Sequence, residues 1–196
     1  MQEVTNHKTV RVKQPELVRQ RILQHAAELA SIQGVSGISI QQVANLAGVS
    51  KGAVFHHFAN KQQLVEEMVK YIIGLLDMQL EALITNDPEP YGQFTRAYIQ
   101  ISLQQNLQGL NSSWTALALT IATDSTFNQY WKDWLDHKLA KYQQSDQHSQ
   151  LKLLRLAVDG LWLGSITQVE SQASCQYWMQ VLLKQSYPSI NVPSVI

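Results

Sequence analysis

The chain has 196 residues, 15 basic and 15 acidic side chains and a net charge of zero, and 45% of its residues are hydrophobic. A chain of this length buries a sizeable core without staples, and its one cysteine, Cys175, excludes an intramolecular disulfide and a thiolate metal cluster. The polar N-terminus and the lack of an apolar run near the roughly 20 residues of a membrane span argue against a signal segment and a membrane helix. We therefore expect a cytoplasmic protein that does not bind a membrane.

Positive charge gathers in the N-terminal third. Residues 1–61 hold seven basic and three acidic side chains, and seven minus three leaves +4 there and −4 over the rest. A basic segment on a neutral-to-acidic body suits a polyanionic partner and predicts salt-sensitive binding. The alternative is a solvated tail, because residues 1–14, with Lys8, Arg11 and Lys13, lack apolar periodicity and are expected to form a flexible arm.

The first predicted helix starts at Pro15, a residue suited to the first turn of a helix, and Gly34 stops it. Its inward stripe consists of Val18, Ile22, Ala26, Leu29 and Ala30. We expect this helix to pack over the two that follow and to complete a three-helix module.

Two short predicted helices come next, joined by a turn of about three residues, as in a helix-turn-helix. Ser39 can cap the first and Gln42 can close a capping box, while Gly48 supplies the left-handed conformation that ends it. The inward positions of this helix are Ile40, Val43, Ala44 and Ala47.

Ser50 can cap the second short helix, whose inward side chains are Val54 and Phe58. The outward positions are Lys51, Gly52, Ala53, His56 and His57. This set combines a cation, small residues that let the backbone approach, and imidazoles that can form hydrogen bonds. Such a surface suits a groove of DNA. The alternative is a helical hairpin inside an all-helical core, with these side chains as ordinary solvated surface.

A long helix follows. Asn60 can cap it, with Gln63 at its third position, and Lys61 beside its positive end could hold a phosphate. The apolar pattern continues to about Thr85, and about 24 residues at 1.5 Å each span roughly 36 Å. We expect a rigid rod between a DNA-binding module over 15–61 and a larger C-terminal part over 62–187.

The stretch from Ser39 to Leu64, with AGVSKGAVFHHFANKQQL at its centre, resembles the DNA-binding signature of the tetracycline-repressor (TetR) family. The resemblance implies an all-α homodimeric repressor that leaves a palindromic double-stranded DNA operator when a small-molecule effector binds the larger C-terminal domain. The DNA-binding residues implied by motif position are Ser39, Gln41, Ser50, Lys51, Gly52, Ala53, Phe55, His56, His57 and Lys61.

Within that set the resemblance implies phosphate contacts for Ser39, His57 and Lys61, and a base contact for Gln41. Phe55 stands where the family usually has a tyrosine that touches DNA. Its missing hydroxyl removes one expected phosphate contact.

Asp87 to Pro90 carries two prolines and is the clearest break in the chain. The helices predicted beyond it cover residues 94–109, 114–122, 124–142, 151–169 and 171–187. Residues 143–149 are predicted as a loop or a frayed helix end, and 188–196 as a loose tail. The predicted fold is all-α with about nine helices, since no alternating strand pattern occurs.

The last two helices are the predicted dimer interface. Gly160 and Gly164 lie one turn apart with Ala157 and Ser165 beside them, and small side chains let a second helix approach closely. The final helix would add Tyr177, Trp178 and Val181. The alternative is close packing within one subunit; a dimer is favoured because two-fold dimers read half-sites about 34 Å apart.

If the resemblance holds, an effector cavity lies among the helices after the proline break. Its candidate residues are Phe94, Tyr98, Trp114, Trp131, Trp134, Asp159 and Trp162. The alternative for each aromatic residue is that it packs in the hydrophobic core and lines no cavity. Asp159 is a carboxylate in a strongly apolar helix; if buried, it needs a cation or hydrogen-bond donors, and Arg155 one turn away is the simplest partner.

No catalytic or cofactor motif emerges. The six histidines show no His-Glu-x-x-His spacing, and neither a phosphate-cradling glycine-rich loop nor Gly-x-Ser-x-Gly is present. We predict a protein that is not an enzyme and needs no metal or cofactor. Two hypotheses remain: a ligand-responsive DNA-binding transcriptional regulator, or a helical small-molecule-binding or interaction protein whose helix-turn-helix only stabilises the fold.

Overall fold

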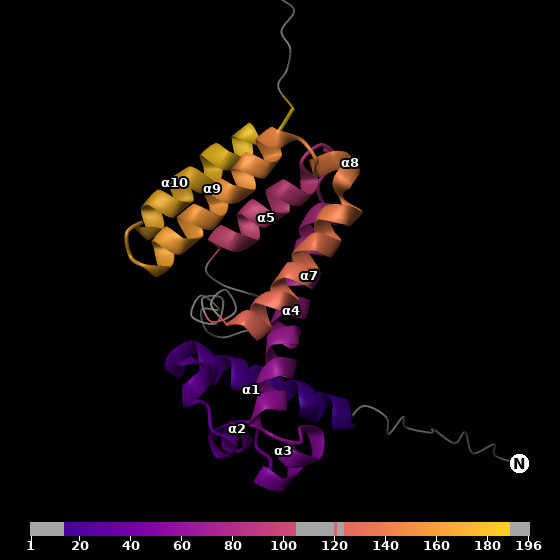
Figure 1. Ribbon diagram of the computed structural model, residues 1–196, viewed down its shortest axis with the longest axis vertical. Coiled ribbons are helices and arrows are strands. Elements are labelled where there is room, and N and C mark those ends of the chain that lie inside the picture. The colour runs from indigo at the N-terminus through magenta and orange to yellow at the C-terminus, as the bar shows by residue number, and fades with distance from the viewer. Residues whose placement is uncertain (1–13, 105–119, 121–123, 189–196) are drawn as a thin grey trace, which may run out of the picture.

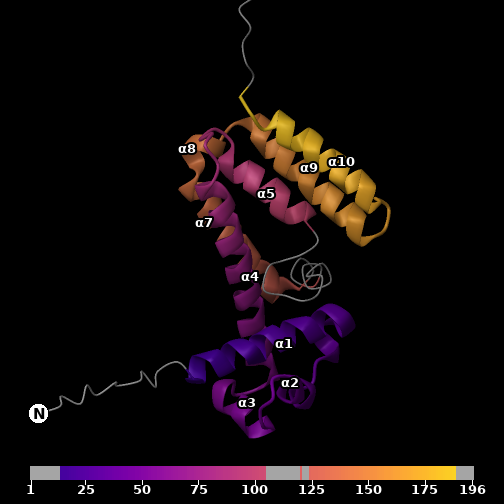
Figure 2. The ribbon, with the colours of Figure 1, turned by 180° about the vertical axis from the view of Figure 1, so that it is seen from behind.

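A computed structural model describes residues 14–104, 120 and 124–188. Over these residues the chain forms nine helices and no strand, which confirms the predicted all-α class. Figures 1 and 2 show a small module at one end of a long helix and a bundle around its other end. The predicted arm (except Gln14), Trp114 with nearly all of the helix predicted over 114–122, and residues 189–196 lie outside the described residues.

The small module consists of α1 (Gln14–Gly37), α2 (Ile40–Leu46) and α3 (Lys51–His57). Its fully buried side chains include predicted inward positions from all three helices, namely Ile22, Ala26, Val43, Ala44 and Val54. The predicted caps are also present: the backbone N–H of Gln42 donates to Ser39 Oγ over 3.2 Å, and that of Ala53 to Ser50 Oγ over 3.1 Å. Local rules therefore account for the helix-turn-helix.

The end of α1 differs from the prediction. Gly34 has φ 76° and ψ 160°, so the regular helix does break there, but helical backbone resumes and continues to Gly37. Glycine adopts such a positive φ at little cost because it has no Cβ. The regular helix thus ends at Gly34 as predicted, and only the short stretch of residues 35–37 extends beyond the prediction.

The long helix is α4 (Lys61–Thr85), and its 25 residues give a length of about 37 Å. One face is buried along the whole helix, through Leu64, Met68, Ile72, Leu76 and Leu80. Arg19 on α1 donates to the Glu67 carboxylate on α4 and lies 5.4 Å from the centroid of the Phe58 ring. These contacts hold the module against the rod without an intervening linker (Figure 1).

The bundle has α5 (Gln93–Leu103) at its centre, packed on α4, α9 (Ser149–Ile166) and α10 (Gln172–Gln185). Alongside the rod lies α7 (Ser125–Lys141) (Figure 1). The helices predicted near these positions are present with ends moved by a few residues. The largest change is at α5, which ends at Leu103 rather than near Gly109 because the backbone becomes extended at Gln104.

The prediction of a loop or frayed end over 143–149 holds for residues 147–148 but was wrong for Gln143–Asp146, which form the short helix α8. Asp146 is only 2% exposed, and its carboxylate accepts hydrogen bonds from the backbone N–H groups of Phe94 (3.2 Å) and Thr95 (2.8 Å). Those donors belong to the first turn of α5, where helices leave N–H groups unpaired. A carboxylate more than 50 residues away thus caps α5.

A buried arginine ties the turn after α4 to the end of α10. Arg96 Nε donates to Asp87 Oδ2 over 2.6 Å, and Nη1 donates to the carbonyls of Tyr91 (2.7 Å) and Ser186 (3.2 Å). A Cβ on Gly92 would lie 2.6 Å from the Ser186 carbonyl oxygen, so the close approach of the two backbones at this point requires glycine. The C-terminal end of α4 is therefore fixed to the end of α10.

Candidate nucleic-acid interface and ligand cavity

The outward face of α3 is free of contacts that would bury it in its own subunit. Lys51, Gly52 and His56 are exposed, and Phe55 is 44% exposed. Ala53 and His57 are half-buried at the edges of this face. The Lys51 ammonium lies 5.9 Å from the centroid of the Phe55 ring. This face lies at the end of the molecule farthest from the bundle (Figure 1).

The polar residues at the flanking helix ends already bond within the chain. Ser39 is a half-buried N-cap and Ser50 an exposed one, and Gln41 Nε2 donates to Asn45 Oδ1 over 2.9 Å. Lys61 Nζ donates to the Ser36 carbonyl over 2.9 Å and is also exposed. An ammonium has three donors, so this bond leaves Lys61 two for a phosphate. The proposed DNA contacts of these residues stay predictions.

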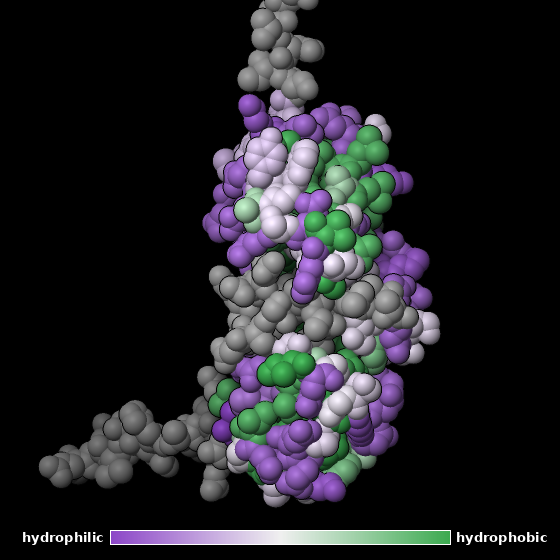
Figure 3. Space-filling view, turned by 90° about the vertical axis from the view of Figure 1, so that its left-hand side faces the viewer, coloured by the Kyte–Doolittle hydropathy of each residue, from purple (hydrophilic) through white to green (hydrophobic). Residues whose placement is uncertain are grey.

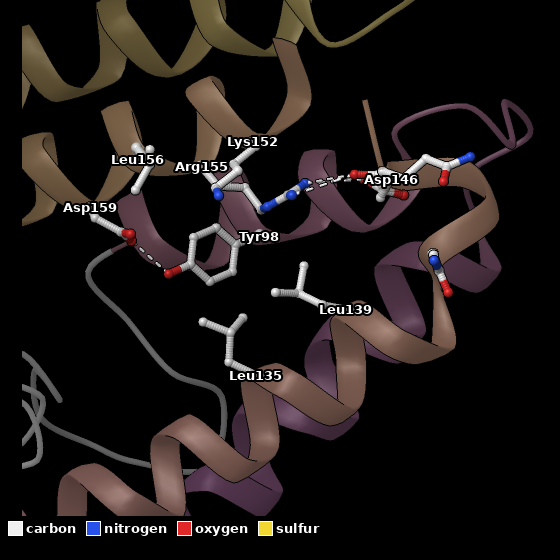
Figure 4. Close-up of a pocket in the computed structure, with 10 residues that line it drawn as sticks. Tyr98, Leu135, Leu139, Asp146, Lys152, Arg155, Leu156 and Asp159 are labelled. Atoms are coloured by element: carbon white, nitrogen blue, oxygen red, sulfur yellow. Dashed lines mark hydrogen bonds and ion pairs between the residues drawn. The ribbon is translucent and has the colours of Figure 1, made fainter. Parts of the chain in front are cut away.

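A cavity of about 360 Å³ lies in the bundle between α5, α7, α8 and α9 (Figure 4). Its lining residues are Tyr98, Leu135, Leu139, Gln143, Asp146, Gln147, Lys152, Arg155, Leu156 and Asp159. Two of the predicted effector residues, Tyr98 and Asp159, are among them. A volume of this size accommodates a small organic molecule.

Four other predicted aromatic residues, all within the described part of the chain, do not line this cavity. Phe94 is fully buried and stacks on Tyr142, with 5.9 Å between ring centroids. Trp131, Trp134 and Trp162 are half-buried and pack against the core. The interpretation of these four as core is therefore the one that the geometry favours.

The sequence analysis missed most of the lining. Lys152, Arg155, Leu156 and Asp159 recur at spacings of three and four residues, so they share one face of α9. This helical spacing was the sequence signal from which the cavity lining on α9 could have been predicted. It was overlooked because the surrounding leucines dominate the pattern, although one of them, Leu153, is 65% exposed.

Arg155, the partner suggested for Asp159, makes no direct bond to it, but its charge favours the ionised carboxylate and so acts to lower the pKa of Asp159. Tyr98 donates to Asp159 Oδ1 over 2.6 Å, whereas Arg155 donates to Thr95 Oγ1 over 2.5 Å and forms an ion pair with Asp146 at 3.7 Å. Asp159 is also solvent-exposed as a whole rather than buried. The protein atoms around its carboxylate nevertheless raise its pKa, an effect that the Tyr98 hydrogen bond opposes.

The α7 wall of the cavity is bonded to the rod. Glu81 on α4 accepts hydrogen bonds from Lys138 (2.5 Å), Lys141 (2.8 Å) and Tyr142 (2.7 Å), and Trp134 Nε1 donates to Asp77 Oδ1 over 2.6 Å. Burial alone would raise the pKa of Glu81, but the three donors lower it to about 2. A charged carboxylate therefore holds α7 on α4.

The outer face of α9 and α10 exposes large apolar side chains, namely Leu153, Leu163, Tyr177 and Trp178. Ala157 and Gly160 lie exposed on the same face, and a Cβ on Gly160 would meet no atom within 4 Å. Gly164 differs, because its Cβ would lie 2.8 Å from Glu170 Cγ of its own subunit. Figure 3 shows green side chains gathered on the upper part of this side of the molecule.

Three of the predicted interface residues pack partly within the subunit: Gly164, Ser165 and Val181 are half-buried. Ser165 Oγ donates to the Trp162 carbonyl over 2.7 Å. Packing within the chain thus explains Gly164 but not Gly160. Among the described residues, no helix is both long and apolar enough to cross a membrane.

Two family models match the chain. Residues 22–68 match the bacterial regulatory proteins of the tetR family, and residues 92–183 match the tetracyclin repressor-like C-terminal domain. The transcriptional regulator AcrR of Shigella flexneri is 40% identical over 73 residues, which are 36% of this chain and 34% of that protein. The chain thus aligns with about a third of the length of that relative.

Other relatives align over more of the chain. The transcriptional regulator BetI of Pectobacterium atrosepticum is 27% identical over 168 residues, covering 74% of this chain and 80% of that protein. A solved transcriptional regulator from Saccharomonospora viridis in complex with choline shares the fold, with a TM-score of 0.66, 18% identity, and coverage of 86% of this chain and 95% of that chain.

Proposed function

Because this chain belongs to the TetR family of transcriptional regulators, we propose that it is a homodimeric repressor that binds a palindromic operator and leaves it when a small molecule enters the cavity. Regulators of this family are DNA-binding repressors that typically respond to ligands. The observation that carries the proposal is the exposed face of α3 at the end of the rod opposite the cavity.

The DNA-binding unit proposed here is the module of residues 15–61. Its α3 would enter the major groove with Lys51, Gly52 and His56, while Ser39 and Lys61 would hold phosphates on either side. One such helix makes few base contacts. Two copies related by a two-fold axis would read half-sites about 34 Å apart, which is why a palindrome is expected.

The dimer interface proposed here is the outer face of α9 and α10. Monomeric proteins rarely leave large contiguous apolar patches exposed, and Tyr177 and Trp178 are residue types enriched at interfaces. The open space above Gly160 would let a helix of the partner approach closely. Residues 62–187 would therefore serve both dimerisation and effector binding.

Ligand binding would reach DNA through the rod. A molecule between α5, α7 and α9 would press on Leu135 and Leu139, and α7 is bonded to α4 through Glu81. A shift of α4 would change the separation of the two α3 helices. A coupling of about 1–3 kcal/mol would lower operator affinity roughly 5- to 150-fold. A related structure in complex with choline supports a small-molecule ligand for this fold.

The test is binding of the full chain to duplexes selected from a random-sequence pool, followed by fluorescence anisotropy at several salt concentrations. The selected sites should be palindromic, and Lys51→Ala and His56→Ala should weaken binding. Lys132→Ala is the matched control, because Lys132 is exposed on α7 and pairs with Asp136 far from α3. Loss of binding in the control alone, or parental affinity in both α3 variants, would refute the interface.

A further inference from the structure

We infer that the cavity takes a small organic acid, with one carboxylate head on an apolar body, as its ligand. The inference rests on the proposed function in treating this cavity as the effector site. It follows from four features of the lining: a free cation, a partly free guanidinium, a saturated carboxylate and an apolar wall.

Two cations face the cavity from adjacent turns of α9. Lys152 and Arg155 are three positions apart, so their side chains share a face of the helix. Within the described part of the chain, the Lys152 ammonium has no ion pair or hydrogen bond. Arg155 uses Nη1 and Nη2 toward Thr95 and Asp146, which leaves its Nε–H without a partner there.

The neighbouring carboxylate cannot serve a cationic ligand. Asp146 Oδ1 accepts from the Thr95 backbone N–H (2.8 Å) and hydroxyl (2.6 Å), and Oδ2 accepts from Phe94 N–H (3.2 Å) and the Ser145 hydroxyl (2.7 Å). Its acceptor sites are occupied by the fold. At the Lys152 end of the cavity two cations face this one saturated carboxylate, while Asp159 brings the charged lining as a whole to zero. Such a lining suits a head group with a single negative charge rather than a phosphate monoester.

The rest of the cavity is suited to an apolar body. Leu135 and Leu139 point from α7 toward the ring of Tyr98 in Figure 4, and Leu156 lines the α9 side. A chain or ring lying there would pass between α5 and α7. The lining thus offers one charged end and a hydrocarbon surface beside it.

Asp159 sets the orientation of such a ligand. It lies seven residues after Lys152, about 10 Å farther along the axis on the same face of α9. Its carboxylate accepts the Tyr98 hydroxyl and repels an anionic head at that end. The acid head therefore lies at Lys152 and Arg155, and a hydroxyl on the far end of the ligand could donate to Asp159.

The experiment is isothermal titration of the full chain with hexanoate, octanoate and decanoate, and with the alkylammonium ions of the same lengths. We expect at least one carboxylate to bind, and its ammonium counterpart to bind at least tenfold more weakly. Lys152→Met keeps the apolar stem and removes the charge, so it should lower carboxylate affinity about tenfold or more. Lys132→Met, outside the cavity, should leave affinity unchanged.

Three results would overturn the inference: no carboxylate binds, the ammonium ion binds as well as the acid, or Lys152→Met matches the parent. Duplex binding, measured in parallel, separates this from the proposed function. A chain that binds its duplex but no carboxylate keeps the repressor function and loses the ligand class. Carboxylate binding that Lys152→Met weakens, without any duplex binding, keeps the ligand class and refutes the repressor.

Discussion

Glu81 of α4 and Lys138 of α7 form a hydrogen-bonded ion pair, with 2.5 Å between Oε1 and Nζ, at the junction of the rod and the cavity wall. Lys138 is only 3% exposed, and it also pairs with Asp77 one turn earlier on α4. At this point α4 and α7 are therefore held together by ion pairs in addition to apolar contacts. In the proposed mechanism, a displacement of α7 by a ligand would be transmitted to α4 at this point.

The pair predicts a pH dependence of stability. The donors lower the pKa of Glu81 from its ordinary 4.5 to about 2 in the folded chain, so the carboxylate stabilises the fold fully above pH 4.5. That stabilisation is lost progressively as the pH falls from 4.5 toward 2. Urea unfolding at a series of pH values should show the loss, and Glu81→Gln should lack this part of it.

Glu66→Gln is the control for the pH series, since Glu66 lies on the same helix and accepts a hydrogen bond from the uncharged Gln62 side chain. It should retain the parental pH dependence. Equal slopes for the parent and Glu81→Gln between pH 4.5 and 2 would show that the pair contributes no acid sensitivity.

Tyr98 and Asp159 should be energetically coupled. Removing the hydroxyl with Tyr98→Phe, or the charge with Asp159→Asn, disrupts the same 2.6 Å bond between α5 and α9. A double-mutant cycle by chemical unfolding should give an interaction free energy of about 0.5–3 kcal/mol. Strict additivity of the two single changes would mean that the bond contributes nothing to stability.

Phe55→Tyr should strengthen duplex binding. The ring of Phe55 is 44% exposed on the outward face of α3, so an added hydroxyl has room to reach a phosphate. One such hydrogen bond contributes about 0.5–1.5 kcal/mol, or roughly 2- to 13-fold in affinity. Because tyrosine is uncharged, the slope of affinity against salt should stay the same, whereas Lys51→Ala should reduce it by about one.

Anisotropy titrations with the selected duplex measure both quantities. An affinity of Phe55→Tyr at or below that of the parent would place the residue away from the phosphates. An altered salt slope in that variant would indicate a changed binding mode instead of one added contact.

Gly160→Glu should convert the proposed dimer to a monomer without unfolding the subunit. A side chain at this position meets no atom of its own chain within 4 Å, so the added carboxylate is tolerated in the monomer but would enter the proposed interface. Sedimentation velocity measures the assembly, and circular dichroism measures the helix content. Gly74→Glu is the control, because Gly74 is an exposed helical glycine of α4 with the same open surroundings.

A monomeric parent, or a Gly160→Glu protein that stays dimeric, would contradict the proposed interface. A shift to monomer in the Gly74 control would point to a dimer formed through the rod.

The sequence by itself determined the helix-turn-helix module and the described helices other than α8. The caps at Ser39, Ser50 and Asn60 bond to groups three residues away, and the inward stripes repeat every three or four residues, so both depend on short segments of chain. The exposed face of α3 follows from the same periodicity, because Val54 and Phe58 must turn inward.

Only the tertiary structure decided the partners of the charged groups in the bundle. Tyr98 and Asp159 are 61 residues apart, Lys138 and Glu81 are 57 apart, and Asp146 caps a helix 51 residues before it. Which helices become neighbours depends on how whole apolar faces fit together, and no local spacing encodes that fit. For this reason Arg155 was assigned to Asp159, the capping helix α8 was taken for a loop, and most of the cavity lining was not foreseen.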